Sequence, residues 1–339
     1  MRKIPTEEAV GQVLCHDITR IIPGKEKGVG FKKGHIICAE DVPELKKLGK
    51  DHIYVWEISP GLLHEDAAAE ILRRICQGRH MLAGPPREGK IELTAQVDGL
   101  FKVDSVRLGA INALGEMMIA ARHGNFPVKT GDVLAGMRVI PLLIEEEKMQ
   151  RAEQLAGAGP LFDLLPLKNK PYAIISTGNE VYHRRIEDAF TPVITAKMAA
   201  YSCNAVFTAT SPDDSGHTAA LIQQAIDSGA ELVICTGGMS VDADDLTPAA
   251  IRASGARVVS YGAPVLPGAM IMLAYYHDHL PIVGLPGCAM YNKITVFDFL
   301  LPRLLADDMI SAGELFALGE GGLCLNCDTC RFPDCGFGK

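Results

Sequence analysis

The sequence predicts an α/β protein whose second half forms a parallel sheet between two layers of helices. A small α+β region and a mostly β domain precede it. Throughout the second half, short apolar runs without polar alternation are separated by amphipathic stretches. Strands buried on both faces show such continuous runs, because the connecting helices cover both faces of a parallel sheet. The predicted strands are 172–176, 206–210, 232–235, 258–260 and 282–285, and the predicted helices are 195–201, 217–227, 248–254 and 290–305.

Changes in pattern along the chain predict five segments. Residues 1–82 combine turns with helical spacing of apolar residues, which indicates an α+β region. Residues 83–144 show apolar alternation and turn signals such as Asp98-Gly99, which are typical of β-hairpins. The stretch 145–170 has a charged helical part that ends at a Gly-Ala-Gly-Pro sequence, and it is predicted to be a linker. The α/β domain is expected at 171–306, and a tail with clustered cysteines at 307–339.

The composition predicts a soluble cytoplasmic protein that binds a small molecule, with no nucleic-acid and no membrane partner. With 339 residues, 48% of them hydrophobic, the chain is long enough for two or three domains with proper cores. A formal net charge of -8 and a pI near 5.7 argue against nucleic-acid binding, because proteins that bind the phosphate backbone normally have a basic face. Residues 1–11 lack the apolar core of a secretory signal, and the apolar stretch 270–276 is too short to span a bilayer.

Residues that can carry chemistry follow four of the predicted strands, at the point where each strand ends. In an open parallel sheet, ligands bind at the carboxyl ends of the strands, so these four loops are expected to meet in one crevice. The loops contain glycines, which let backbone N–H groups approach a phosphate, and carboxylates, which suit a magnesium ion. They are 177–180, 211–214, 236–240 and 286–288.

Each of these residues also has a purely structural interpretation. Gly237 and Gly238 can form a tight turn without touching a ligand. Asp213 or Asp214 can cap the helix that begins near Gly216, and Asp244 or Asp245 can cap the helix that contains 246–248. Three carboxylates from three strand ends, Glu180, Asp213 and Asp245, nevertheless favour a shared magnesium site over three unrelated roles.

With these motifs in place, the segment 170–305 resembles the molybdopterin-binding domains of the MoeA/MogA family. The resemblance is carried by Ser-Thr-Gly-Asn-Glu at 176–180, by Thr-Gly-Gly-Met-Ser at 236–240 followed by Asp245, and by Gly-Leu-Pro-Gly at 284–287. It implies that this domain binds molybdopterin or its adenylylated form, as a ligand or as a substrate.

Residues 5–49 look like the start of MoeA-type molybdenumtransferases, so the chain resembles a divergent MoeA-like protein of molybdenum cofactor biosynthesis. Enzymes of this type insert molybdate with release of AMP and use magnesium. Carried over by motif, Glu180, Asp213 and Asp245 would be the catalytic residues that hold the cation or orient molybdate, while magnesium stabilises charge on the breaking phosphoanhydride. The cofactor-binding residues would be Thr177, Gly178, Thr236, Gly237, Gly238, Ser240, Pro286 and Gly287, with Gly237, Gly238 and Ser240 around a phosphate.

Three departures from the family's pattern leave other functions open. The chain passes from Ile21-Ile22-Pro23 to Lys33-Gly34 without the family's Asp-Arg-Ser-Ala-Met-Asp-Gly-Tyr-type segment. The chain has Leu266-Pro267-Gly268-Ala269 where MoeA-type enzymes carry two lysines around a Pro-Gly pair, and Cys288-Ala289 follows Gly287 in place of Asn-Pro. A non-catalytic carrier or sensor of the finished cofactor is the alternative, and hydrolysis of another adenylylated or pyrophosphate substrate is a third interpretation. The resemblance also leaves open a homodimer, and a molybdoenzyme or biosynthetic partner.

Four of the 10 cysteines are crowded into the carboxyl-terminal tail, where two, two and four residues separate them. In a reducing compartment, such a cluster indicates a metal or redox site more than a disulfide framework. Sulfur ligands select iron–sulfur clusters or zinc, and the spacing resembles the ferredoxin run of two, two and three. The tail is therefore predicted to bind a [4Fe-4S] cluster in preference to Zn2+, with an unmetallated redox tail as a further alternative. The predicted metal ligands are Cys324, Cys327, Cys330 and Cys335.

Overall fold

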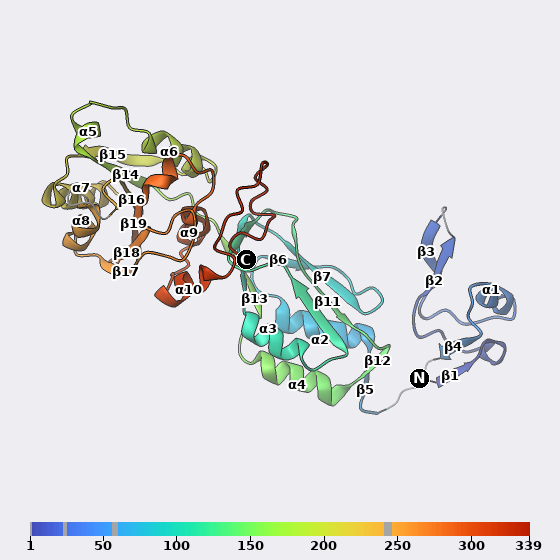
Figure 1. Ribbon diagram of the computed structural model, residues 1–339. Helices are drawn as coiled ribbons and strands as arrows, with labels where there is room; N and C mark the ends of the chain where they lie inside the picture. Colours follow the sequence, from blue (N-terminus) through green and yellow to red (C-terminus); the bar gives the residue numbers. More distant parts are fainter. Residues whose placement is uncertain (1, 23–25, 56–59, 241–245) are drawn as a thin grey trace. The chain divides into compact units, whose positions relative to one another are not determined.

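The computed structural model describes residues 2–22, 26–55, 60–240 and 246–339. The chain divides into two compact units, each of which contains more than one stretch of sequence (Figure 1). None of the helices in these described ranges is long and apolar enough to cross a membrane. Unit 1 comprises Met1–Gln96, Val103–Arg122 and Gly131–Asp163, and unit 2 comprises Val97–Lys102, His123–Thr130 and Leu164–Lys339.

The amino-terminal part of unit 1 is a small α+β structure with a core of its own. Strand β1 pairs antiparallel with β4, and β2 pairs antiparallel with β3. Buried side chains such as Ile4, Leu14 and Leu45 form the core between these strands and helix α1. The elements are β1 (Arg2–Pro5), η1 (Thr6–Ala9), β2 (Ile18–Ile22), β3 (Glu26–Phe31), α1 (Asp41–Lys47) and β4 (His52–Val55).

The rest of unit 1 is built on a four-stranded antiparallel sheet of order β6-β7-β11-β9. Helix α2 contacts β7 and β11 and buries one face, on which apolar residues such as Ala68, Ala69 and Leu72 recur at helical spacing. Helix α4 buries Met149 and Ala152 and packs against α2 and α3. The elements are β5 (Leu62–His64), α2 (Glu65–Cys76), β6 (Met81–Ala83), β7 (Lys90–Ala95), α3 (Ser105–Asn112), β9 (Met117–Ala121), β11 (Val133–Val139), β12 (Leu143–Glu145) and α4 (Glu146–Ala156).

A separate three-stranded sheet has the order β10-β8-β13, formed by β8 (Gly99–Val103), β10 (Phe126–Val128) and β13 (Phe162–Pro166). The stretch predicted to be a linker, 145–170, thus contains helix α4 and strand β13. The five predicted segment boundaries stay a prediction, because the structure divides the chain on a different basis, by its compact units.

Unit 2 is built on a six-stranded, mostly parallel sheet of order β15-β14-β16-β19-β18-β17. The four strands β15, β14, β16 and β19 are mutually parallel, as predicted. The structure adds an antiparallel strand, β18, which forms a hairpin with β19 through a polar turn at 277–279. The strands are β14 (Tyr172–Thr177), β15 (Ala205–Ser211), β16 (Leu232–Thr236), β17 (Arg257–Tyr261), β18 (Met272–Tyr276) and β19 (Leu280–Leu285).

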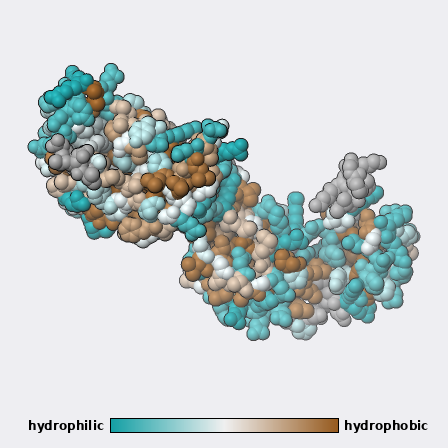
Figure 2. All heavy atoms as spheres, in the orientation of Figure 1, coloured by the Kyte–Doolittle hydropathy of each residue, from teal (hydrophilic) through white to brown (hydrophobic). Residues whose placement is uncertain are grey.

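Helices cover both faces of this sheet, so the predicted three-layer α/β architecture is confirmed (Figure 1). Successive residues of a strand point to opposite faces, and in β14 Ile174 packs with helices α6 and α9 whereas Ile175 packs with α7 and α8. The visible surface is mostly hydrophilic, with apolar side chains in small patches (Figure 2). The helices of unit 2 are α5 (Asn179–Tyr182), α6 (Phe190–Ala199), α7 (Ser215–Asp227), α8 (Thr247–Ala253), α9 (Val296–Leu305) and α10 (Ala312–Phe316), with short turns η2 (Gly287–Met290) and η3 (Ala317–Gly319).

We expect Ile174→Ala to lower the free energy of unfolding of unit 2 by about 2–5 kcal/mol, because it leaves a cavity in a fully buried layer. The matched control is Ile186→Ala, which removes the same atoms from a side chain that is 57% exposed and should change the free energy by less than about 0.5 kcal/mol. Urea denaturation followed by circular dichroism measures both. Equal effects of the two substitutions would contradict the packing described for β14.

Candidate functional site

The four loops predicted to carry chemistry follow four neighbouring strands of the unit 2 sheet. Because β15, β14, β16 and β19 are adjacent and parallel, their carboxyl ends lie in a row on one edge of the sheet. We refer to this row of loops as the strand-end edge. It consists of residues 177–180, 211–214, 236–240 and 286–288, of which all are described.

Gly237 and Gly238 allow the loop after β16 to pack directly against the end of β14. A Cβ atom on Gly237 would lie 2.1 Å from the carbonyl oxygen of Thr177, and one on Gly238 would lie 3.0 Å from Thr247 Oγ1. Both glycines also have positive φ angles, 77° and 54°. These two glycines are therefore required by the fold itself, which the sequence left undecided between a turn and a phosphate cradle.

Two threonines at the strand ends are buried and use their hydroxyl groups to join neighbouring strands. Thr177 Oγ1 donates to the carbonyl oxygen of Thr236 at 2.9 Å and lies 2.8 Å from Thr247 Oγ1. Thr236 Oγ1 in turn donates to Ser176 Oγ at 3.2 Å. Thr177 and Thr236 position the loops, and contact between their side chains and a ligand stays a prediction.

Asp213 and Glu180 come from neighbouring loops, after β15 and β14. The backbone N–H of Asn179, next to Glu180, donates to Asp213 Oδ2 at 3.0 Å. The carboxylate of Glu180 folds over Gly178, with Oε1 2.7 Å from the position that a Cβ of Gly178 would take. Helix α7 is capped by the next residue, Asp214, which accepts from the N–H of His217 at 2.7 Å. Asp213 is therefore not the cap of α7, whereas Asp245 lies outside the described residues.

Asp188 is a polar residue near the strand-end edge that sequence reasoning missed. It accepts a hydrogen bond from Ser176 Oγ at 2.6 Å and another from Thr191 Oγ1 at 2.5 Å. Burial alone would raise the pKa of Asp188, but these hydrogen bonds and those from the N–H groups of Phe190 and Thr191 outweigh it and lower the pKa below its usual value. An aspartate just before a helix is a recognisable capping signal, and Asp188 ties the start of α6 to the end of β14.

The loop after β19 presents an open glycine. Gly287 is exposed, has no positive φ angle, and a Cβ placed on it would meet no atom within 4 Å. Pro286 is buried, and Ser240 in the adjacent loop after β16 is exposed. The hydroxyl of Tyr261 donates to the carbonyl oxygen of Met239 at 2.9 Å and thereby holds the loop that carries Ser240. Free space above Gly287 suits the close approach of a ligand to the backbone.

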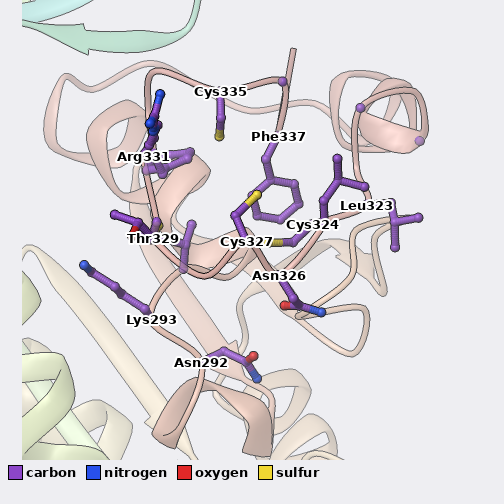
Figure 3. Close-up of a pocket in the computed structure, with 17 residues that line it drawn as sticks. Asn292, Lys293, Leu323, Cys324, Asn326, Cys327, Thr329, Arg331, Cys335 and Phe337 are labelled. Atoms are coloured by element: carbon purple, nitrogen blue, oxygen red, sulfur yellow. The ribbon is translucent and has the colours of Figure 1, made fainter.

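The four tail cysteines line one cavity of about 440 Å3, all of whose lining residues belong to unit 2 (Figure 3). All four are free thiols; Cys324 and Cys335 are half-buried, whereas Cys327 and Cys330 are exposed. Within the described ranges, no group of three or more His, Cys, Asp or Glu side chains is arranged to hold a metal ion. The structure thus brings the predicted cysteines into one cavity but does not bring their sulfur atoms together, and neither the predicted cluster nor a magnesium site is shown.

The open parallel sheet with its loops on one edge defines unit 2 as an α/β domain of the ligand-binding type. Residues 173–306 match the family model described as a probable molybdopterin binding domain. This match covers less than half of the chain, and it agrees with the resemblance carried by the motifs of this segment. Residues 3–57 match a domain of unknown function (DUF8806), and the likeness of 5–49 to MoeA-type enzymes stays a prediction.

A similar protein of known function is the molybdopterin molybdenumtransferase of Synechococcus elongatus. It is 27% identical over 176 residues, which cover 49% of this chain and 44% of the relative, so the chain spans less than half of the relative's length. Similar solved structures include the tungsten cofactor synthesizing protein MoaB from Pyrococcus furiosus, 18% identical over 35% of this chain and 81% of that one, with a TM-score of 0.30. Another is the molybdopterin biosynthesis enzyme MoaB from Thermus thermophilus, 16% identical over 40% and 91%, with a TM-score of 0.33. At these TM-scores the two structural likenesses carry no inference of their own.

Substitution of the packed Gly237 and of the open Gly287 should affect stability differently. Gly237→Ala should lower the free energy of unfolding of unit 2 by about 1–3 kcal/mol, because the new methyl group overlaps the Thr177 carbonyl at a positive φ angle. Gly287→Ala should leave the free energy unchanged within about 0.5 kcal/mol, since its Cβ enters open space. Urea denaturation of both variants tests this, and a Gly237→Ala variant as stable as the wild type would overturn the packing assigned to the β16 loop.

Proposed function

We propose that unit 2 binds molybdopterin or its adenylylated form at the strand-end edge. The observation that carries this proposal is the alignment of four loops on one edge of a parallel sheet, in a segment that matches the molybdopterin-binding family. An anionic ligand there would meet the N–H groups of glycine-containing loops and of helix starts, which favour phosphate. The residues proposed to line it are Thr177, Gly178, Thr236, Gly237, Gly238, Ser240, Pro286 and Gly287.

Gly287 offers a way to test binding without disturbing the fold. Gly287→Leu places a bulky side chain in open space and should weaken molybdopterin binding by about tenfold or more, a loss of roughly 1.4 kcal/mol. Gly313→Leu is the matched control, because Gly313 in α10 is equally open and lies away from the strand-end edge. Binding is measured by releasing the pterin from purified protein and quantifying its fluorescent oxidation product. Unchanged pterin content in Gly287→Leu would remove the β19 loop from the site.

We further propose that the domain catalyses insertion of molybdate into molybdopterin with release of AMP, as the name of the Synechococcus elongatus relative suggests for that protein. The reaction breaks the phosphoanhydride of the adenylylated pterin, and a magnesium ion would offset the charge that develops there. Glu180 and Asp213 come from adjacent loops whose backbones are joined by the hydrogen bond from Asn179 to Asp213. Asp245 completes the proposed acidic set, although it lies outside the described residues.

Comparing variants of the two neighbouring aspartates after β15, Asp213 and Asp214, tests whether Asp213 binds magnesium, because Asp214 only caps helix α7. Asp213→Asn keeps an oxygen for the N–H of Asn179 but removes the charge, so magnesium affinity should fall by about tenfold or more. Asp214→Asn makes the same chemical change in the cap of α7, where asparagine caps nearly as well, and should leave magnesium affinity unchanged. Titration calorimetry with magnesium measures both. If the two variants bind magnesium equally well, Asp213 only joins the two loops.

The alternative is a non-catalytic carrier or sensor of the finished cofactor. It is favoured by the carboxyl-terminal tail, where we propose that Cys324, Cys327, Cys330 and Cys335 bind a metal centre, a [4Fe-4S] cluster or Zn2+. AMP release from adenylylated molybdopterin and molybdate distinguishes the two: a transferase releases about one AMP per molybdopterin converted, whereas a carrier binds the pterin and releases none. A homodimer, and a molybdoenzyme or biosynthetic partner, remain part of this proposal.

A further inference from the structure

We propose that the tail is a thiolate metal site with two fixed and two mobile ligands. Cys324 and Cys335 are held in place by the fold, and Cys327 and Cys330 reach the metal when the loop 325–331 closes over the cavity. This inference rests on the metal binding proposed for the tail and does not depend on the strand-end proposal.

The first fixed ligand, Cys324, lies where the chain pairs with the segment that leads into β18. The N–H of Leu266 donates to the carbonyl oxygen of Gly322 at 2.7 Å, and the N–H of Cys324 donates to the carbonyl oxygen of Leu266 at 2.8 Å. Leu266 and Leu323 thus form a parallel bridge. Two backbone hydrogen bonds on either side of Leu323 fix the position of the Cys324 thiol.

The second fixed ligand, Cys335, lies between two aromatic anchors. The ring centroids of Phe332 and Phe337 lie 5.6 Å and 4.7 Å from that of Phe299 in α9. Cys335 itself packs against the same apolar core, of which Phe337 is a buried member. Beyond it, the N–H of Gly338 donates to the carbonyl oxygen of Gly321 at 2.9 Å, which joins the end of the chain to the start of the tail. The tail is thus tied down on both sides of its middle loop.

The middle of the tail is not held by hydrogen bonds of this kind. In the described chain, no hydrogen bond is formed by the backbone or side chains of residues 325–330. Cys327 and Cys330 are exposed, as is Leu325 at 79%. A segment with few buried contacts and no hydrogen bonds opens and rearranges at low free energy. The two exposed thiols are therefore carried by the part of the tail that can move.

Closure is needed because the four thiols line the cavity without meeting. Zinc binds thiolate sulfur at about 2.3 Å, and a cluster likewise needs its sulfur ligands around one centre. In the described residues the four thiols line a cavity of about 440 Å3 and are not grouped around one point. Figure 3 shows Cys324, Cys327 and Cys335 on the walls of this cavity around Phe337. When a metal binds, each ligating thiol releases its proton to solvent, and iron and sulfide, or zinc, must be supplied from outside.

The site borders the strand-end edge. Met272, at the start of β18, pairs with Gly284 near the end of β19, so the segment 266–271 enters the sheet from the strand-end side. The floor of the cavity includes Asn292, whose side chain donates to the carbonyl oxygen of Cys288 at 3.1 Å. A metal held by the tail would therefore lie beside the loop that carries Gly287.

The first measurement is the metal content of the full chain, purified without oxygen and then supplied with iron and sulfide or with zinc. The wild type should hold either about four iron and four sulfide ions or about one zinc ion per chain, and this result distinguishes the two centres. Replacing both mobile ligands, Cys327→Ser with Cys330→Ser, should reduce the metal at least about tenfold. Cys38→Ser, which removes an exposed thiol outside the tail, should bind metal like the wild type.

The second measurement is hydrogen exchange of the loop 325–331 with and without metal. Metal should slow exchange in this loop in the wild type and in Cys38→Ser, and the metal-free double variant should unfold at the same temperature as the metal-free wild type. If the wild type binds metal but hydrogen exchange in the loop is not slowed, or if the double variant still binds metal, the assignment of Cys327 and Cys330 as mobile ligands is wrong. The proposal that the tail binds metal is not affected by these two outcomes. Absence of iron and zinc after reconstitution, or a disulfide between tail cysteines in place of metal, would overturn both. Neither outcome affects the pterin test at Gly287.

Discussion

Burial of the central strands on both faces is the constraint on which the rest of unit 2 depends. Every residue of β14 and β16 is buried, and the two apolar layers leave no room for an unpaired polar group. A buried polar group without a partner costs several kcal/mol, so groups available for chemistry are displaced to the strand ends. Thr177 and Thr236 lie where the apolar strands give way to the polar loops. Their hydroxyls are buried, but they form hydrogen bonds to neighbouring strands. The same packing that stabilises the sheet therefore determines where a ligand can bind.

The sheet was predictable from the sequence because buried parallel strands show uninterrupted apolar runs. Strand β18 was not identified as a strand. Its direction could not be predicted either, because a buried antiparallel strand such as Met272–Tyr276 shows the same uninterrupted apolar run as a buried parallel strand. Nor could the sequence show that residues 97–102 and 123–130 belong to unit 2. That assignment depends on contacts between distant residues, such as the rings of Phe126 and Phe299, which local pattern does not encode.

The position of the candidate site was predictable for a geometric reason, whereas the role of each residue in it was not. Loops after adjacent parallel strands must share an edge, whatever their sequence. Whether Asp213 or Asp214 caps α7 depends on backbone angles that differ within one turn, and only the structure assigns the cap to Asp214. The carbonyl of Thr177 occupies the space that a side chain at position 237 would need, so the fold requires Gly237, and its contact with a phosphate stays a prediction. A glycine motif alone does not distinguish room for a ligand from room for the backbone.

The tail pairs with the rest of unit 2 at a point where the sequence departs from the MoeA-type pattern. Where the resemblance leads one to expect lysines, the backbone of Leu266 is hydrogen-bonded on both sides to Gly322 and Cys324. The segment around Leu266 is therefore paired with the tail, which carries thiols in place of ammonium groups. An anionic ligand would depend more on backbone N–H groups at the loops and helix starts, which attract phosphate without a full positive charge. Thiolates supply soft ligands where lysines supply charge, so the metal affinity proposed for the tail would be independent of the pterin affinity proposed for the strand-end edge.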